Sequence, residues 1–175
     1  MLATAEWIIP DATKSILSDA ECLTIVLSIY FHDMGLVVTE TEFQHRADSG
    51  FRAFCNDHLF TGSGGADYQA KIGLLDPDHK ERFLYQEYVR ANHGRRIRAW
   101  IEGTQNPDLG YAKVQIEEID RLLRPLDTDY RKDLALVCES QNLDDLDDLK
   151  KYRLSHPYGN SDNETVNLQY CATVL

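Results

Sequence analysis

Near its start the chain reads Ser18-Asp-Ala-Glu-Cys-Leu-Thr-Ile-Val-Leu-Ser-Ile-Tyr-Phe31, followed directly by His32-Asp33-Met34-Gly35. Ser18 and Glu21 have the spacing of a capping box, so a helix is predicted to start at residue 19. The apolar run that follows predicts a central, buried helix that extends to Asp33. An imidazole and a carboxylate at the end of such a run are costly to bury unless something pairs with them.

Two interpretations of the His32-Asp33 pair follow from the sequence. A divalent metal would use both side chains, since histidine nitrogen and aspartate oxygen are ordinary metal ligands. Alternatively, the helix ends here, the two side chains are polar residues at its rim, and Gly35 is the C-cap. The dipeptide by itself leaves both interpretations open.

Helical patterns also dominate the rest of the chain. A second capping box, Thr39 to Glu42, predicts a helix over 40–59, and Asp76-Pro77 predicts the start of a long helix. The further helices are expected at 77–102, 112–123, 128–141 and from about 165 onward, with loops at 61–65 and 152–163. Strand signals are weak, so we predict one all-α domain over residues 1–175, a bundle of about six to eight helices.

Composition excludes several classes of function. The 175 residues are 43% hydrophobic and 27% charged, as in an ordinary globular protein, and the formal net charge is −11. This acidity argues against a broad nucleic-acid-binding surface, although it permits a local basic pocket. The longest strongly apolar stretch, residues 23–31, is too short to span a bilayer, so no membrane partner is expected.

The cysteines and the N-terminus predict a cytoplasmic protein. Cys22, Cys55, Cys138 and Cys171 are widely spaced, and each lies in a segment predicted to be helical. Packed, reduced thiols are therefore expected rather than disulfides or a zinc cluster. The first residues lack the basic and apolar regions of a signal peptide.

A second candidate for chemistry is His93-Gly-Arg95-Arg96, within the predicted helix 77–102. A histidine followed by two arginines could place a metal ligand beside groups that bind phosphate, because guanidinium groups contact phosphate oxygens in a fork. The alternative is a solvated basic patch with no ligand.

In their order and spacing, three segments resemble the HD-domain superfamily of metal-dependent phosphohydrolases. The resemblance is closest to a subtype found fused to, or beside, Hsp90-like ATP-binding modules. The segments are 20–36 with His-Asp-Met-Gly, 88–101 with His-x-Arg-Arg, and 136–167 with Cys-Glu-Ser and Leu-Asp-Asp-Leu-Asp-Asp-Leu.

The resemblance implies a helical bundle in which His32 and Asp33 are the catalytic pair and hold a divalent metal (Mn, Fe, Mg, Zn or Ni). A water activated by that metal would attack the phosphorus of a nucleotide, a phosphodiester or another phosphorylated small molecule. By the same resemblance His93 is a further metal residue, and Arg95 and Arg96 contact the substrate phosphate. An ATPase domain in the same protein or operon is the implied partner.

The chain also departs from the family pattern. Residues 1–17 contain no histidine to match the one that the family places before the pair, and the chain stops at residue 175, before the family's later aspartate. Gln141 and Asn142 are amides, where relatives often have histidine. We therefore expect either a chain cut at both ends or a degenerate homologue that serves as a regulatory or interaction module. A helical protein without a site, whose His32 and Asp33 merely hydrogen-bond, is the third possibility.

Overall fold

The computed structural model of the chain describes residues 9–60, 65–141, 143–153 and 166–174. Within these ranges the regular structure is entirely helical, which confirms the all-α prediction. None of the helices so described is long and apolar enough to cross a membrane. Most of the loop expected at 152–163 lies outside the described residues.

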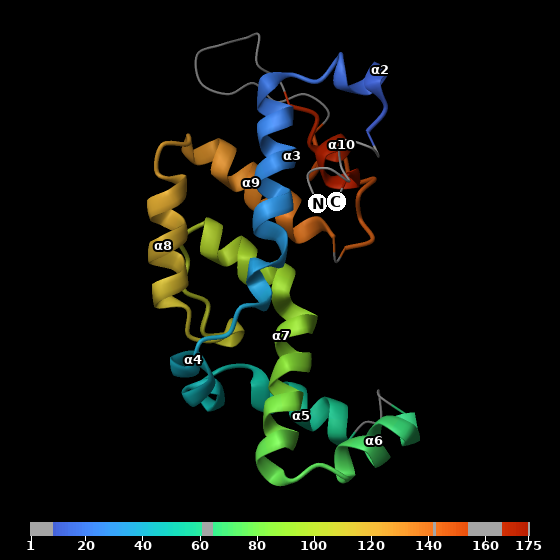
Figure 1. Cartoon of the computed structure of the whole chain (residues 1–175), viewed down its shortest axis with the longest axis vertical. Coiled ribbons are helices and arrows are strands. Elements are labelled where there is room, and N and C mark those ends of the chain that lie inside the picture. The colour runs from blue at the N-terminus through green and yellow to red at the C-terminus, as the bar shows by residue number, and fades with distance from the viewer. Residues whose placement is uncertain (1–8, 61–64, 142, 154–165, 175) are drawn as a thin grey trace.

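Helix α7 joins two groups of helices (Figure 1), with α3, α8, α9 and α10 around one end and α4, α5 and α6 around the other. In chain order the α-helices are α2 (Asp11–Lys14), α3 (Asp19–Phe31), α4 (Glu40–Gln44), α5 (Phe51–Phe60), α6 (Gly65–Gly73), α7 (Pro77–Ile101), α8 (Lys113–Leu123), α9 (Thr128–Ser140) and α10 (Leu168–Thr173). Three 3-10 turns accompany them, η1 (His32–Leu36), η2 (Arg46–Asp48) and η3 (Pro107–Leu109).

The predicted capping box at the start of α3 is present. The Ser18 hydroxyl accepts from the Glu21 backbone N–H at 3.1 Å, and the Glu21 carboxylate accepts from the Ser18 backbone N–H at 2.8 Å. The helix ends at Phe31 rather than at Asp33, because His32 already belongs to the tighter turn η1. His32 and Asp33 are therefore the first two residues of η1.

The expectation that α3 is central and buried is only half right. One face is buried and the other is open to solvent. The buried residues are Thr24, Ile25, Ser28, Ile29 and Phe31, whereas Leu23, Val26 and Tyr30 are exposed. The central helix is instead α7, which contributes Leu84, Tyr85, Tyr88 and Val89 to one apolar core and Ile97, Ala99, Trp100 and Ile101 to another.

The helix expected over 40–59 is broken into α4, η2 and α5. The break falls at Ser49, which is extended, and at Gly50, whose N–H donates to the Asp108 carbonyl at 3.2 Å. A Cβ on Gly50 would lie 3.0 Å from that same carbonyl oxygen. The chain bends here because a contact with the distant turn η3 outweighs local helix propensity.

The later helices follow their predicted bounds closely. In α7 the Asp76 side chain accepts from the His79 N–H at 3.2 Å, Pro77 opens the helix, and Gly103 (φ +72°) follows its end. Helices α8 and α9 differ from the predicted ranges by one residue each. The last helix starts at Leu168, later than the expected 165, which lies outside the described residues.

Because Gly35 has no side chain, the backbone of η1 can lie directly against the backbone of α7. A Cβ built on Gly35 would lie 2.1 Å from the His93 carbonyl oxygen and 2.8 Å from its carbonyl carbon. Such distances are impossible for a real side chain. Moving the backbone of a long packed helix to relieve them would cost considerable free energy. Gly35 is thus required by close packing rather than by a C-cap conformation, because Gly103 and Gly110 are the glycines with positive φ in the described backbone.

Gly35→Ala is expected to lower the free energy of unfolding by about 3 kcal/mol, since η1 and α7 must move apart. The measurement is chemical denaturation followed by circular dichroism. Gly73→Ala is the matched control, because a Cβ there meets no atom within 4 Å. Equal stabilities of the two variants would contradict this account of the packing.

The cysteines give a second test of the core. All four are free thiols; Cys138 and Cys171 are buried, whereas Cys22 is exposed, so the expectation of packed thiols fails for Cys22. Burial raises the pKa of Cys171 to about 12 and also raises the pKa of Cys138.

A maleimide should therefore label Cys22 in the native protein, and Cys138 and Cys171 only after unfolding. Mass spectrometry of timed samples measures this, and equally fast labelling of Cys138 would refute the burial.

Candidate functional site

The His32 side chain is held at the junction of α3 and η1 by two carbonyls of the last turn of α3. Its ring Nδ1 lies 3.1 Å from the Ser28 carbonyl oxygen and 3.0 Å from that of Ile29. Because carbonyl oxygens only accept hydrogen bonds, Nδ1 must carry the proton. In the neutral ring, Nε2 then has a free lone pair, which is the form of imidazole that binds metals.

That Nε2 atom faces the carboxylate of Asp33. The distance from His32 Nε2 to Asp33 Oδ2 is 3.2 Å, and the two side chains are 13% and 53% exposed. Two electron-pair donors this close must share a cation, which is either a proton or a metal ion. Ligands about 2.1 Å from a metal and at right angles to each other lie about 3 Å apart, so the pair fits two neighbouring positions around one metal.

His93 reaches the same region from α7. Its Nδ1 lies 2.6 Å from the Arg90 carbonyl oxygen, and its Nε2 lies 3.2 Å from Nε2 of Gln141. The same Gln141 nitrogen donates to the His32 carbonyl at 3.2 Å. His93 is therefore connected to the backbone of His32 through the side-chain amide of Gln141. The sequence did not indicate this role for Gln141.

Arg96 has a different place from the one expected. It is fully buried, and all five of its N–H donors have acceptors within the protein. Nε donates to Gly35 O (2.7 Å), Nη1 to Glu42 Oε1 (2.5 Å) and Leu109 O (2.7 Å), and Nη2 to Val37 O (3.0 Å) and Glu42 Oε2 (3.1 Å). A guanidinium so committed has no donor left for a substrate phosphate, which corrects the phosphate-binding prediction for Arg96.

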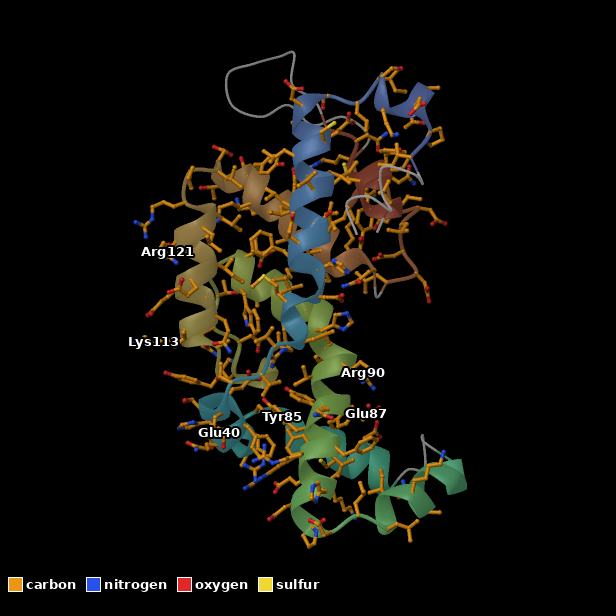
Figure 2. All side chains as sticks on the ribbon, viewed as in Figure 1. Glu40, Tyr85, Glu87, Arg90, Lys113 and Arg121 are labelled. Carbon is orange, nitrogen blue, oxygen red and sulfur yellow. The ribbon has the colours of Figure 1, made fainter. Side chains whose placement is uncertain are left out.

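Glu42, the partner of Arg96, was visible in the sequence only as a capping residue. Thr39 does cap α4, accepting from the Glu42 N–H at 3.1 Å, but the Glu42 carboxylate turns inward and is fully buried. The Tyr85 hydroxyl donates to Glu42 Oε1 at 2.7 Å, and Figure 2 shows Tyr85 between α7 and α4. Burial and this carboxylate raise the pKa of Tyr85. The network joins α4, η1 and α7.

Arg95 lies on a different face of α7 from His93. Two residues along an α-helix turn about 200° around its axis, so His93 and Arg95 point in nearly opposite directions. The Arg95 side chain is exposed and donates to Asn92 Oδ1 at 3.4 Å. Arg95 is therefore free to meet solvent but is not beside His93, as the His-x-Arg-Arg interpretation required.

The third segment of the resemblance has mainly structural contacts. Cys138 is buried, the Glu139 carboxylate accepts from Arg98 Nη1 at 2.6 Å, and the Ser140 hydroxyl donates to the Val137 carbonyl at 2.6 Å. The ion pair between Arg98 and Glu139 fastens the end of α9, next to Gln141, to α7.

Further metal ligands do not gather at the pair within the described ranges, where no group of three or more His, Cys, Asp or Glu side chains could hold a metal ion. Four hollows on the described surface have linings that do not include His32, Asp33 or His93. Of these four, the one with the greatest volume, about 580 Å³, lies where the end of α7 meets α8 and α9. Of the pair, Asp33 is half exposed and His32 is mostly buried.

An all-α chain with a His-Asp pair at the end of one helix, docked on a long second helix, has the arrangement expected of an HD-like domain. The model of the HD-CE family matches residues 1–175. The chain belongs to the HD-CE family. No curated protein and no solved structure matches it. The HD resemblance is therefore confirmed, while the association with Hsp90-like ATPases stays a prediction.

Arg96→Met is expected to lower the free energy of unfolding by about 3 to 5 kcal/mol, because it leaves the Glu42 carboxylate buried without its counter-charge. Glu42→Gln should cost a similar amount, and the double variant should cost less than the sum, since both remove one interaction. Urea denaturation measures all three.

Arg95→Met is the matched control for Arg96→Met and should change the unfolding free energy by no more than about 0.5 kcal/mol, because its side chain is exposed. If Arg95 and Arg96 proved equally tolerant of methionine, the buried network would not carry the stability assigned to it.

Proposed function

We propose that this chain is a metal-dependent phosphohydrolase-type HD domain that acts on a nucleotide or a phosphodiester. The main support is the 3.2 Å distance between His32 Nε2 and Asp33 Oδ2. The imidazole is held in place by hydrogen bonds from its Nδ1 to the Ser28 and Ile29 carbonyls. Two donor atoms at this distance could occupy neighbouring positions around one metal ion. Membership of the HD-CE family supports the same assignment.

His32 and Asp33 would hold the metal, and one nitrogen and one oxygen ligand suit Mn²⁺, Fe²⁺, Zn²⁺ or Ni²⁺ better than the oxygen-preferring Mg²⁺. A metal bound there supplies an activated water and draws charge from a phosphoryl oxygen. Because Asp33 is half exposed, water and substrate could reach a metal held by the pair. We do not assign the phosphate contact to Arg96, because its guanidinium is bound to Glu42. Nor do we assign it to Arg95, which lies on a different face of α7 from His93.

The alternative is a catalytically degenerate module that regulates or docks on a larger protein with an Hsp90-like ATPase domain. One observation favours it: Arg96 and His93, both expected at a reaction site, are engaged in bonds within the protein. The ordered motifs that resemble the ATPase-associated subtype support such a partner, in the same chain or operon, in the cytoplasm.

His32→Ala and Asp33→Asn should each abolish binding of Mn²⁺ or Ni²⁺ to the protein, because each removes one of the two ligands. Calorimetric titration measures the binding. Hydrolysis of bis(p-nitrophenyl) phosphate and of a set of nucleotides in added Mn²⁺ should be lost in the same variants if the domain is active.

His79→Ala is the control, because the His79 ring also pairs with a carboxylate, that of Asp76 at 2.5 Å, but on an exposed part of α7. Its metal binding should equal that of the unaltered protein. Metal binding without hydrolysis would favour the regulatory module, and metal binding that survives His32→Ala would refute the site itself.

A further inference from the structure

His93, Gln141 and the backbone of His32 form a continuous chain of hydrogen bonds that no part of the proposed metal chemistry uses. The Gln141 amide nitrogen lies 3.2 Å from both His93 Nε2 and the His32 carbonyl oxygen. Only the NH₂ end of an amide can donate to a carbonyl, so this end must be the one that faces His32. Its two N–H groups then serve the two acceptors, one each.

This geometry indicates the tautomer of the neutral His93 ring. Nε2 accepts from Gln141, so the proton of the neutral ring is on Nδ1, from which it is donated to the Arg90 carbonyl at 2.6 Å. Both ring nitrogens are thereby engaged in contacts with the protein. The Nε2 lone pair that a metal would need is the one that Gln141 occupies.

His93 also touches the His-Asp turn through its own backbone. The Gly35 Cα lies against the His93 peptide, so closely that a Cβ there would be 2.1 Å from its carbonyl oxygen. The turn η1 is thus held to α7 at Gly35 and to the end of α9 at the His32 carbonyl. Those two supports lie on either side of Asp33.

We propose that His93 and Gln141 are positioning residues for the His32-Asp33 pair, and that His93 is not itself a metal ligand in this state. Through Gln141, the imidazole of His93 orients the peptide that carries His32, and so sets the direction of the His32 and Asp33 side chains. This inference rests on the proposed metal site, and it replaces the ligand role expected for His93. Groups that orient metal ligands in this way change metal affinity without touching the metal.

The first experiment records long-range ¹H–¹⁵N correlations of the histidine rings in the metal-free protein, with His93→Ala to assign the His93 signals. A single Nδ1–H tautomer of His93 is expected, because the Arg90 carbonyl accepts from Nδ1. Gln141→Leu should keep that tautomer but shift the ¹⁵N resonance of Nε2, which loses its hydrogen bond to the amide. A purely packing role for Gln141 would leave that resonance unshifted. An Nε2–H tautomer in the unaltered protein, or an Nε2 resonance indifferent to Gln141→Leu, overturns the proposal.

The second experiment titrates Ni²⁺ into the protein and into His93→Ala, Gln141→Leu and the double variant. Each single change should weaken Ni²⁺ affinity about 10-fold, and the double variant should be no weaker than either single, because the two residues act in one chain. Arg95→Ala, on the same helix but exposed, should leave the affinity unchanged.

The outcomes separate this inference from the proposed function. Ni²⁺ binding that requires His32 but ignores His93→Ala and Gln141→Leu overturns only the positioning role. Complete loss of binding in His93→Ala, with Gln141→Leu harmless, makes His93 a ligand and also overturns it. Failure of the unaltered protein to bind Ni²⁺ overturns both.

Discussion

The guanidinium of Arg96 is the group around which the described part of the chain is organised. Removing a guanidinium and a carboxylate from water costs several kcal/mol per ion. Here the cost is offset because Glu42 supplies both carboxylate oxygens and three carbonyls take the remaining N–H groups. Those carbonyls belong to Gly35, Val37 and Leu109, so one buried side chain ties η1, the segment after it and η3 to α7. With η1 fixed in this way, His32 and Asp33 have a defined direction.

Much of the fold could be predicted because its helices carry local signals. The Ser18 capping box, Asp76-Pro77 and Gly103 mark helix ends through bonds within a few residues of each end, and the structure has them. The expected helix over 40–59 is wrong for the opposite reason, since Gly50 bends the chain to meet the distant Asp108. Capping geometry is local, whereas this contact depends on the finished fold.

The site shows the same division. The adjacency of His32 and Asp33 can be read from the sequence, whereas the contact between their side chains depends on the tighter turn η1. The role of Arg96 could not be deduced, because an arginine in a basic run has the same pattern whether it meets solvent or a buried Glu42. In the sequence Gln141 is notable only as an amide where relatives often have histidine, whereas in the fold it donates to His32 and His93. Spacing along α7 alone could have shown that Arg95 and His93 do not share a face.

The α3–η1 junction is proposed to present His32 Nε2 and Asp33 Oδ2 to one divalent cation. A crystal structure of the protein soaked in Mn²⁺, with anomalous data, is the direct test. We expect an anomalous peak within about 2.3 Å of both atoms, with His93 Nε2 still accepting from Gln141. A His32–Asp33 pair joined by a proton alone, with Mn²⁺ bound elsewhere or not at all, would refute this metal site.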